Sequence, residues 1–175
     1  MELPNKSSIH RLVRIALFFA VGVILSFVES YAVPVGVLPA GVRLGLANIP
    51  VMLATASFSK REGLYLTTLK SLLAFMTRGI TAGLLSHAGG LLSIMVLSLL
   101  LLFKQKTSCL LLGCCGSAAH GFGQLVFASV LTGTPYVFLH APVLIGCSIA
   151  TGMLTGSLFY LLLPHINAMF CKLED

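Results

Sequence analysis

Charged residues are scarce in this chain of 175 residues: they make up only 9% of it, whereas apolar residues make up 57%. A soluble domain of this length needs far more charge to cover its surface, and its core would be too small to hide so much apolar sequence. No Asp, Glu, Lys or Arg occurs between Lys106 and Lys172. A stretch that long without charge must lie in lipid or be covered by protein. The sequence therefore predicts an integral membrane protein whose surroundings are the lipid bilayer.

Several functional signatures are also missing. No GxxxxGK[ST] occurs, so we expect no nucleotide-binding loop. The five cysteines are odd in number and lack CxxC spacing, which argues against a metal site or a disulfide framework. Basic residues outnumber acidic ones 11 to 5, but they stand singly or in pairs between apolar runs. That pattern is typical of membrane topology rather than of a nucleic-acid partner. We expect no metal and no cofactor.

The apolar runs between charges, prolines and glycines predict an all-α fold. We expect one integral membrane domain over residues 1–175, built as a polytopic six-transmembrane-helix bundle. The helices are predicted at about 12–28, 44–58, 63–77, 79–103, 108–131 and 142–163. The second and third are short for a span of about 20 residues. No internal repeat is evident, which disfavours an inverted-repeat transporter.

Lysine and arginine predict the orientation of this bundle. With six spans and a cytoplasmic N-terminus, eight basic residues fall inside: Lys6, Arg11, Arg14, Lys60, Arg61, Lys104, Lys106 and Lys172. Only three, Arg43, Lys70 and Arg78, fall outside or within the membrane. This bias predicts a multi-pass protein with both termini cytoplasmic.

Charged residues within or beside the spans are candidates for function, because burial in a membrane is costly. Glu29 ends the first predicted helix, and Arg43 opens the second across a loop rich in proline and glycine. They can pair with each other or with a charged ligand, or lie in water at the interface. Lys70 stands in the middle of the third segment. It faces either a polar cavity or, if that helix is tilted, the interface.

Uncharged polar residues extend this candidate site. Asn48 lies at an irregular helix start beside Gly45 and Pro50, where it can face a ligand or cap the helix. His120 and Gln124 are one turn apart on the fifth predicted helix, so they share a face. Their side chains can bind a ligand, or they can form hydrogen bonds only with neighbouring helices. Arg43, Asn48, Lys70, His120 and Gln124 form the predicted ligand-binding set. Its two basic residues favour a ligand with a carboxylate, a phosphate or electron-rich carbonyls.

Small residues predict close helix packing. The fifth segment carries Gly113, Ser117 and Gly121 at intervals of four, and the sixth carries a similar stripe of Ser148, Gly152 and Gly156. Because small residues let backbones approach each other, we expect these two helices to pack together.

Three stretches together carry a resemblance to a known family. They are GVRLGLANI at residues 41–49, SHAGGLLS at 86–93 and GSAAHGFGQ at 116–124. With the preceding Glu29, they resemble the Gx transporter family, whose members are often labelled heptaprenyl diphosphate synthase component I. The resemblance covers about Glu29 to Gly156. The chain departs from it at Arg43, where the family usually has Lys, and at Gly121, where it usually has Asn.

This family is similar to the substrate-binding subunits of energy-coupling-factor vitamin transporters. The resemblance implies a six-helix protein of the bacterial cytoplasmic (inner) membrane that binds a small, vitamin-like molecule. It also implies docking on a transmembrane coupling subunit driven by two ATPases. An AxxxA pattern on the first helix serves docking in those subunits, which makes Ala16 and Ala20 the candidates here. The loop between the first two helices commonly covers the ligand.

Three functions remain in view. The first is that of a transporter subunit. The second is that of an accessory membrane component of a prenyl diphosphate synthase. Catalysis itself is excluded because prenyl elongation needs paired Asp-rich motifs for Mg²⁺, and the single Asp here is Asp175. The third is that of a structural subunit of a larger membrane complex, for which the polar residues of the predicted interior have no evident use.

Overall fold

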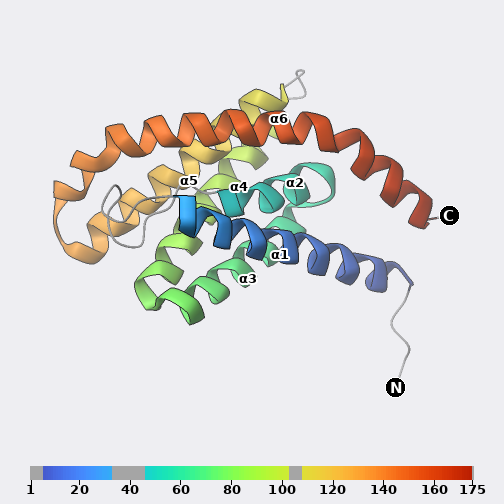
Figure 1. Cartoon of the computed structure of the whole chain (residues 1–175), viewed down its shortest axis with the longest axis horizontal. Coiled ribbons are helices and arrows are strands. Elements are labelled where there is room, and N and C mark those ends of the chain that lie inside the picture. Colours follow the sequence, from blue (N-terminus) through green and yellow to red (C-terminus); the bar gives the residue numbers. More distant parts are fainter. Residues whose placement is uncertain (1–5, 33–45, 103–107, 175) are drawn as a thin grey trace.

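The computed structural model describes residues 6–32, 46–102 and 108–174, and it confirms the expected all-α fold with six helices. The α-helices are α1 (Lys6–Ala32), α2 (Ile49–Ser57), α3 (Lys60–Arg78), α4 (Ile80–Leu102), α5 (Cys109–Thr132) and α6 (Ala141–Glu174). Two 3₁₀-helices, η1 (Leu46–Asn48) and η2 (Pro135–His140), lead into α2 and α6. Consecutive helices pack side by side from α3 to α6, and α2 lies among α1, α3, α4 and α6. In Figure 1, α1 begins and α6 ends at the same end of the bundle.

Local sequence explains where the central helices begin and end. The side chains of Ser59 and Ser108 accept hydrogen bonds from backbone N–H groups in the first turns of α3 and α5. This is the usual role of serine at a helix N-terminus. Gly79 and Gly133 close the same two helices with positive φ values of 91° and 65°. A residue with a side chain rarely adopts this backbone conformation.

The last helix differs from the sequence-based expectation. The sequence predicts its end at residue 163, but α6 continues through Pro164 to Glu174. Proline removes one backbone hydrogen bond and crowds the preceding turn, which favours a helix end in water. Helices in membranes accommodate such a residue because their neighbours satisfy the freed backbone groups. The first helix is also longer than predicted, since it begins at Lys6 rather than near residue 12.

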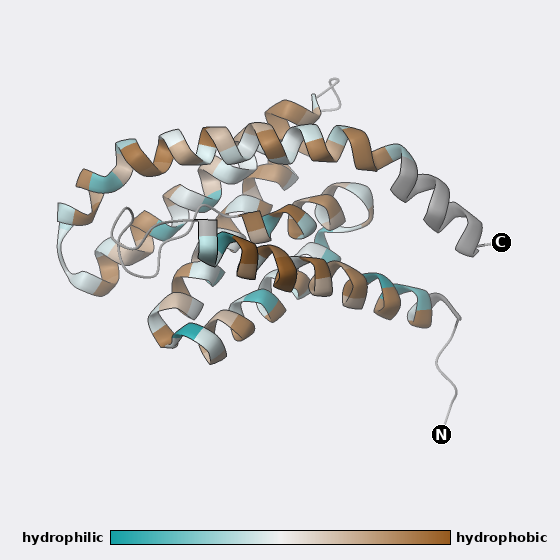
Figure 2. Ribbon diagram, viewed as in Figure 1, coloured by the Kyte–Doolittle hydropathy of each residue, from teal (hydrophilic) through white to brown (hydrophobic). Residues whose placement is uncertain are grey.

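Four of the described helices are long and apolar enough to cross a membrane. They cover Ser8–Tyr31, Ile80–Leu102, Cys109–Thr132 and Pro135–Pro164. Figure 2 shows hydrophobic residues along the outer helices α1 and α6. The chain is thus a multi-pass membrane protein.

Helix α3 is less apolar than these four, and the direction of its side chains explains why. Its polar residues Glu62, Thr67, Lys70 and Ser71 are buried inside the bundle. Between its charged ends, its exposed face is mostly apolar, with Leu64, Tyr65, Leu69, Leu72, Phe75 and Met76, and the hydroxyl groups of the exposed Thr68 and Thr77 bond to carbonyl oxygens of the same helix. The surface that α3 offers to its surroundings therefore suits lipid, and its polarity faces the protein interior.

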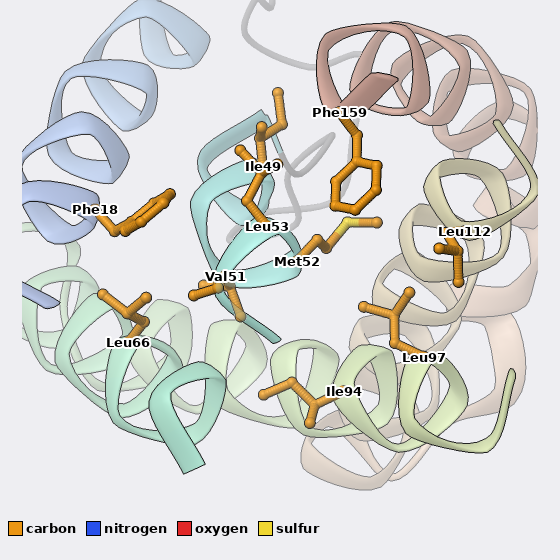
Figure 3. Packing of buried hydrophobic residues seen from close by; sticks show 11 residues of the cluster. Phe18, Ile49, Val51, Met52, Leu53, Leu66, Ile94, Leu97, Leu112 and Phe159 are labelled. Atoms are coloured by element: carbon orange, nitrogen blue, oxygen red, sulfur yellow. The ribbon is translucent and has the colours of Figure 1, made fainter. Parts of the chain in front are cut away.

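An apolar cluster surrounds α2 and joins it to the other helices. In Figure 3, Phe18 of α1, Leu66 of α3 and Phe159 of α6 approach α2 from different sides. Val51, Met52 and Leu53 of α2 meet them, with Ile94 and Leu97 of α4 and Leu112 of α5 completing the contact. This cluster fixes the short α2 in the middle of the bundle.

The expected packing of the fifth helix on the sixth is confirmed. A Cβ atom at Gly113 would lie 2.7 Å from the Cα of Gly156, and one at Gly121 would lie 2.7 Å from Oγ of Ser148. The two backbones are therefore close enough that side chains at these positions have no room. The small residues of the two stripes permit this contact.

Candidate ligand site

The centre of the candidate site is Asn48, which lies where η1 passes into α2. Its side chain is buried and bridges two other helices. The amide Oδ1 accepts a hydrogen bond from Lys70 Nζ of α3 at 3.2 Å, and Nδ2 donates to Ser93 Oγ of α4 at 3.1 Å. The side chain makes no capping hydrogen bond to α2. The interpretation of Asn48 as a helix cap is therefore wrong.

Ser93 extends this connection to a fourth helix. Its hydroxyl group is fully buried and donates to the carbonyl oxygen of Gly116 in α5 at 2.9 Å. Lys70, Asn48, Ser93 and the Gly116 carbonyl thus form one chain of hydrogen bonds across α3, α2, α4 and α5. We call these four residues the polar chain.

Lys70 brings a positive charge into the interior. Its exposed fraction is only 8%, and its amino group points at Asn48 rather than away from the bundle. Burying an ammonium group is costly unless polar partners surround it. The structure therefore places Lys70 in a polar interior and not on the apolar outer face of α3.

His120 and Gln124 are both buried on α5 and contact each other. Nε2 of Gln124 lies 3.0 Å from Nε2 of His120. An amide nitrogen is a donor, so the imidazole Nε2 accepts and the proton belongs on Nδ1. Within the described part of the chain, Nδ1 makes no hydrogen bond of regular geometry and lies against the backbone of Gly89.

Further polar side chains around this region were missed by the sequence reasoning. Thr67, one turn before Lys70, is fully buried, and its Oγ1 has no hydrogen-bond partner within the described part of the chain. Ser71 contacts Nδ1 of His87 at 3.3 Å. The spacing of Thr67, Lys70 and Ser71 places all three on one face of a helix. That periodicity was a usable signal for a polar face on α3.

Two glycines of α4 let the neighbouring helices approach this region. A Cβ at Gly89 would lie 2.9 Å from Nδ1 of His120, and one at Gly90 would lie 2.5 Å from Cγ2 of Thr67. Polar groups of α3 and α5 therefore pack directly on the two sides of α4. The SHAGGLLS stretch contributes both these glycines and Ser93.

The other sequence-based candidates are Glu29, Arg43, Ala16 and Ala20. Glu29 is buried near the end of α1. Arg43 lies outside the described residues, so its pairing with Glu29 stays a prediction. Ala16 and Ala20 lie on the exposed face of α1, among Val13, Leu17 and Val21, and are accessible to a partner helix.

Apolar packing around α2 and the ion pairs of Glu62 also hold the described helices together. A small apolar cavity of about 10 Å³ lies next to α2, between Met52, Leu112 and Phe159. It has room for about one water molecule and no more. Arg14 Nη2 of α1 lies 3.0 Å from Oε1 of Glu62 in α3, and its guanidinium group covers the ring of Phe58.

Comparison with known proteins gives two matches. Residues 18–162 match the family described as heptaprenyl diphosphate synthase component I. A solved structure, described as the S component of a bacterial ECF transporter, has a TM-score of 0.62 to this chain. The two are 20% identical, and the match covers 91% of this chain and 96% of the other. No curated protein matches the sequence. The structural match shows a shared fold.

Proposed function

We propose that this chain, which belongs to the heptaprenyl diphosphate synthase component I family, is the substrate-binding subunit of a multi-subunit membrane transporter. The observation that carries the proposal is the polar chain, in which Lys70, Asn48 and Ser93 are buried within a bundle of membrane helices. Buried ionisable residues in membrane proteins mark ligand and ion pathways. The shared fold with an ECF transporter S component supports the same role.

The ligand is a small, vitamin-like or anionic molecule. Lys70 supplies positive charge, Asn48 is its hydrogen-bonded neighbour, and His120 and Gln124 supply hydrogen-bonding groups from α5. Arg43 adds a second basic residue from the sequence just before Asn48. A ligand with a carboxylate, a phosphate or electron-rich carbonyls matches this set of donors.

The energy for transport comes from partner subunits. The sequence has no nucleotide-binding loop, so we propose docking on a transmembrane coupling subunit with ATPases. The exposed face of α1 with Ala16 and Ala20 provides a surface where another helix can approach closely. The basic residues favour both termini inside, and the resemblance to bacterial transporter subunits favours the bacterial cytoplasmic membrane.

A second candidate function rests on the description of the family. An accessory role in a prenyl diphosphate synthase would use the chain as a membrane anchor, without catalysis, because its single Asp is Asp175. The buried Lys70 favours transport over this role, because an anchor has no need of a charge inside its bundle.

Replacing Lys70 tests the ligand site. Small molecules that co-purify with the wild-type protein are identified by mass spectrometry, and their affinity is then measured for each variant. We expect Lys70→Met and His120→Ala to weaken binding at least about tenfold, which corresponds to about 1.4 kcal/mol. The control is Leu69→Met, next to Lys70 but on the exposed face of α3. Wild-type affinity in both site variants would end this assignment.

Enlarging the α1 surface tests docking. We expect the double variant Ala16→Trp, Ala20→Trp to reduce co-purification of the coupling subunit and ATPases at least about tenfold, because bulky side chains keep helices apart. Binding of the small molecule should stay unchanged. The control is Met153→Trp on the exposed face of α6. If the coupling subunit and ATPases co-purify with the double variant as well as with the wild type, they do not dock on the Ala16 and Ala20 surface of α1.

A further inference from the structure

We infer that the amide oxygen of Asn48 occupies the place of a ligand oxyanion on Lys70, so that a carboxylate-like group binds by displacing it. The inference rests on the proposed binding function and adds both a ligand class and a role for Asn48. In the structure, Lys70 Nζ donates to Asn48 Oδ1, while the other end of the amide donates to Ser93. Asn48 is therefore a competitor of the ligand rather than a group that binds it.

The length of the bond makes the exchange favourable. Lys70 Nζ and Asn48 Oδ1 are 3.2 Å apart. Charge-assisted hydrogen bonds between an ammonium group and a carboxylate are shorter, about 2.7–2.9 Å, and about twice as strong as neutral ones. A neutral ligand oxygen would only replace one amide oxygen by another, whereas an oxyanion gains charge pairing. The site therefore selects for negative charge.

The Asn48 side chain can leave Lys70 without removing a cap from α2. It does not cap α2, and the apolar cluster around Val51, Met52 and Leu53 holds that helix without it. Ser93 keeps its own hydrogen bond to the carbonyl oxygen of Gly116 when Asn48 turns away. The side chain of Asn48 then gives up two hydrogen bonds, the one from Lys70 and the one to Ser93.

Two buried polar atoms near Lys70 indicate what else the ligand offers. Among the residues that the structure describes, neither Nδ1 of His120 nor Oγ1 of Thr67 has a partner for a regular hydrogen bond, although both atoms are buried. Thr67 lies one turn before Lys70 on α3 and packs on Gly90 of α4, and His120 packs on the adjacent Gly89. A carboxylate-like group has several lone pairs, so it can accept from Lys70 and from one of these neighbours.

The inference predicts opposite effects for two substitutions at one position. Asn48→Ala removes the competitor and opens access to Lys70. Asn48→Asp keeps the size of the side chain but places a fixed carboxylate beside the ammonium group. That internal ion pair should hold Lys70 more tightly and exclude external anions.

The rate at which Lys70 reacts with an anionic reagent measures how far the residue at position 48 blocks its amino group. The purified full-length protein is treated with the acetyl ester of N-hydroxysulfosuccinimide, a small anionic reagent that acetylates amines, and the rate at each lysine is followed by mass spectrometry. The exposed Lys60 at the start of α3 is the internal standard. Relative to Lys60, we expect Lys70 to react about tenfold faster in Asn48→Ala and about tenfold slower in Asn48→Asp. Acetate should protect Lys70 in Asn48→Ala, and acetamide should not.

The acetylation rates of Lys70 either support or overturn the displacement of Asn48 by an anion. Equal relative rates of Lys70 in the wild type and both variants, or equal protection by acetate and acetamide, would overturn the inference. If Asn48→Ala does not fold, the slower reaction in Asn48→Asp still tests it. Failure of the transport proposal looks different: Lys70 would respond as expected, but no oxyanion-bearing compound would co-purify with the wild-type protein.

Discussion

A single methyl group added at Gly152 is expected to lower the stability of the bundle by about 3 kcal/mol, at the upper end of the usual cost of overpacking. A Cβ at this position would lie 2.6 Å from the Cα of Cys114 and 3.0 Å from the carbonyl oxygen of Gly113. Both are backbone atoms, so no side chain can rotate away. Helices α5 and α6 would have to separate along their whole contact.

A second glycine on the same helix provides the control. Apart from its own helix, no atom of the described residues lies within 4 Å of the place where a Cβ at Gly146 would be. Gly146→Ala should therefore be neutral or stabilising by up to about 1 kcal/mol, because alanine favours a helix. Thermal unfolding of both variants in the same detergent makes the comparison. Equal melting temperatures for Gly152→Ala and Gly146→Ala would contradict the close contact of the two helices.

Removing the carboxylate of Glu62 is expected to be at least as damaging. The side chains of Arg14 and Glu62 are only 14% and 5% exposed, and they meet at 3.0 Å. Taking one partner from a buried ion pair leaves the other charge without compensation, which costs about 3–5 kcal/mol. We therefore expect Glu62→Gln to lower the melting temperature strongly, since the amide keeps the shape but not the charge.

Two further variants separate charge from packing at this position. The double variant Arg14→Met, Glu62→Met removes both charges and should lose less stability than Glu62→Gln alone, because apolar pairs often replace buried ion pairs well. Arg11 lies 3.9 Å from the same carboxylate with 37% of its side chain exposed. Arg11→Met should therefore cost less than about 1 kcal/mol. A Glu62→Gln protein as stable as the Arg11→Met protein would show that the ion pair with Arg14 has little value.

The fold was largely predictable because hydropathy and charge mark membrane helices directly. Uninterrupted apolar runs gave four of the helices, and the charges at Lys60 and Arg78 delimited α3. The end of α6 was mispredicted because a proline stops a helix in water more firmly than in a bundle of membrane helices. Local sequence does not record what surrounds a residue.

The candidate site was predictable in its members but not in its connections. The cost of burying polar groups singled out Lys70, Asn48 and His120. The partner of Asn48 on α4 depends on how α2 and α4 align, which no local pattern encodes. Ser93 was overlooked because a single serine in an apolar helix is common and usually bonds its own backbone.

The outward apolar face of α3 bears on how the protein enters the membrane during synthesis. A lysine at the centre of a segment costs about 2.5–3.5 kcal/mol when that segment inserts by itself. Lys70 meets Asn48 at the end of η1, and Glu62 meets Arg14 on α1, so the partners of both buried charges are made before α3. Ser93, which completes the polar chain, is made after it. Helix α3 is therefore a segment whose insertion depends on neighbours already in the membrane, and the order of the helices along the chain supplies them first.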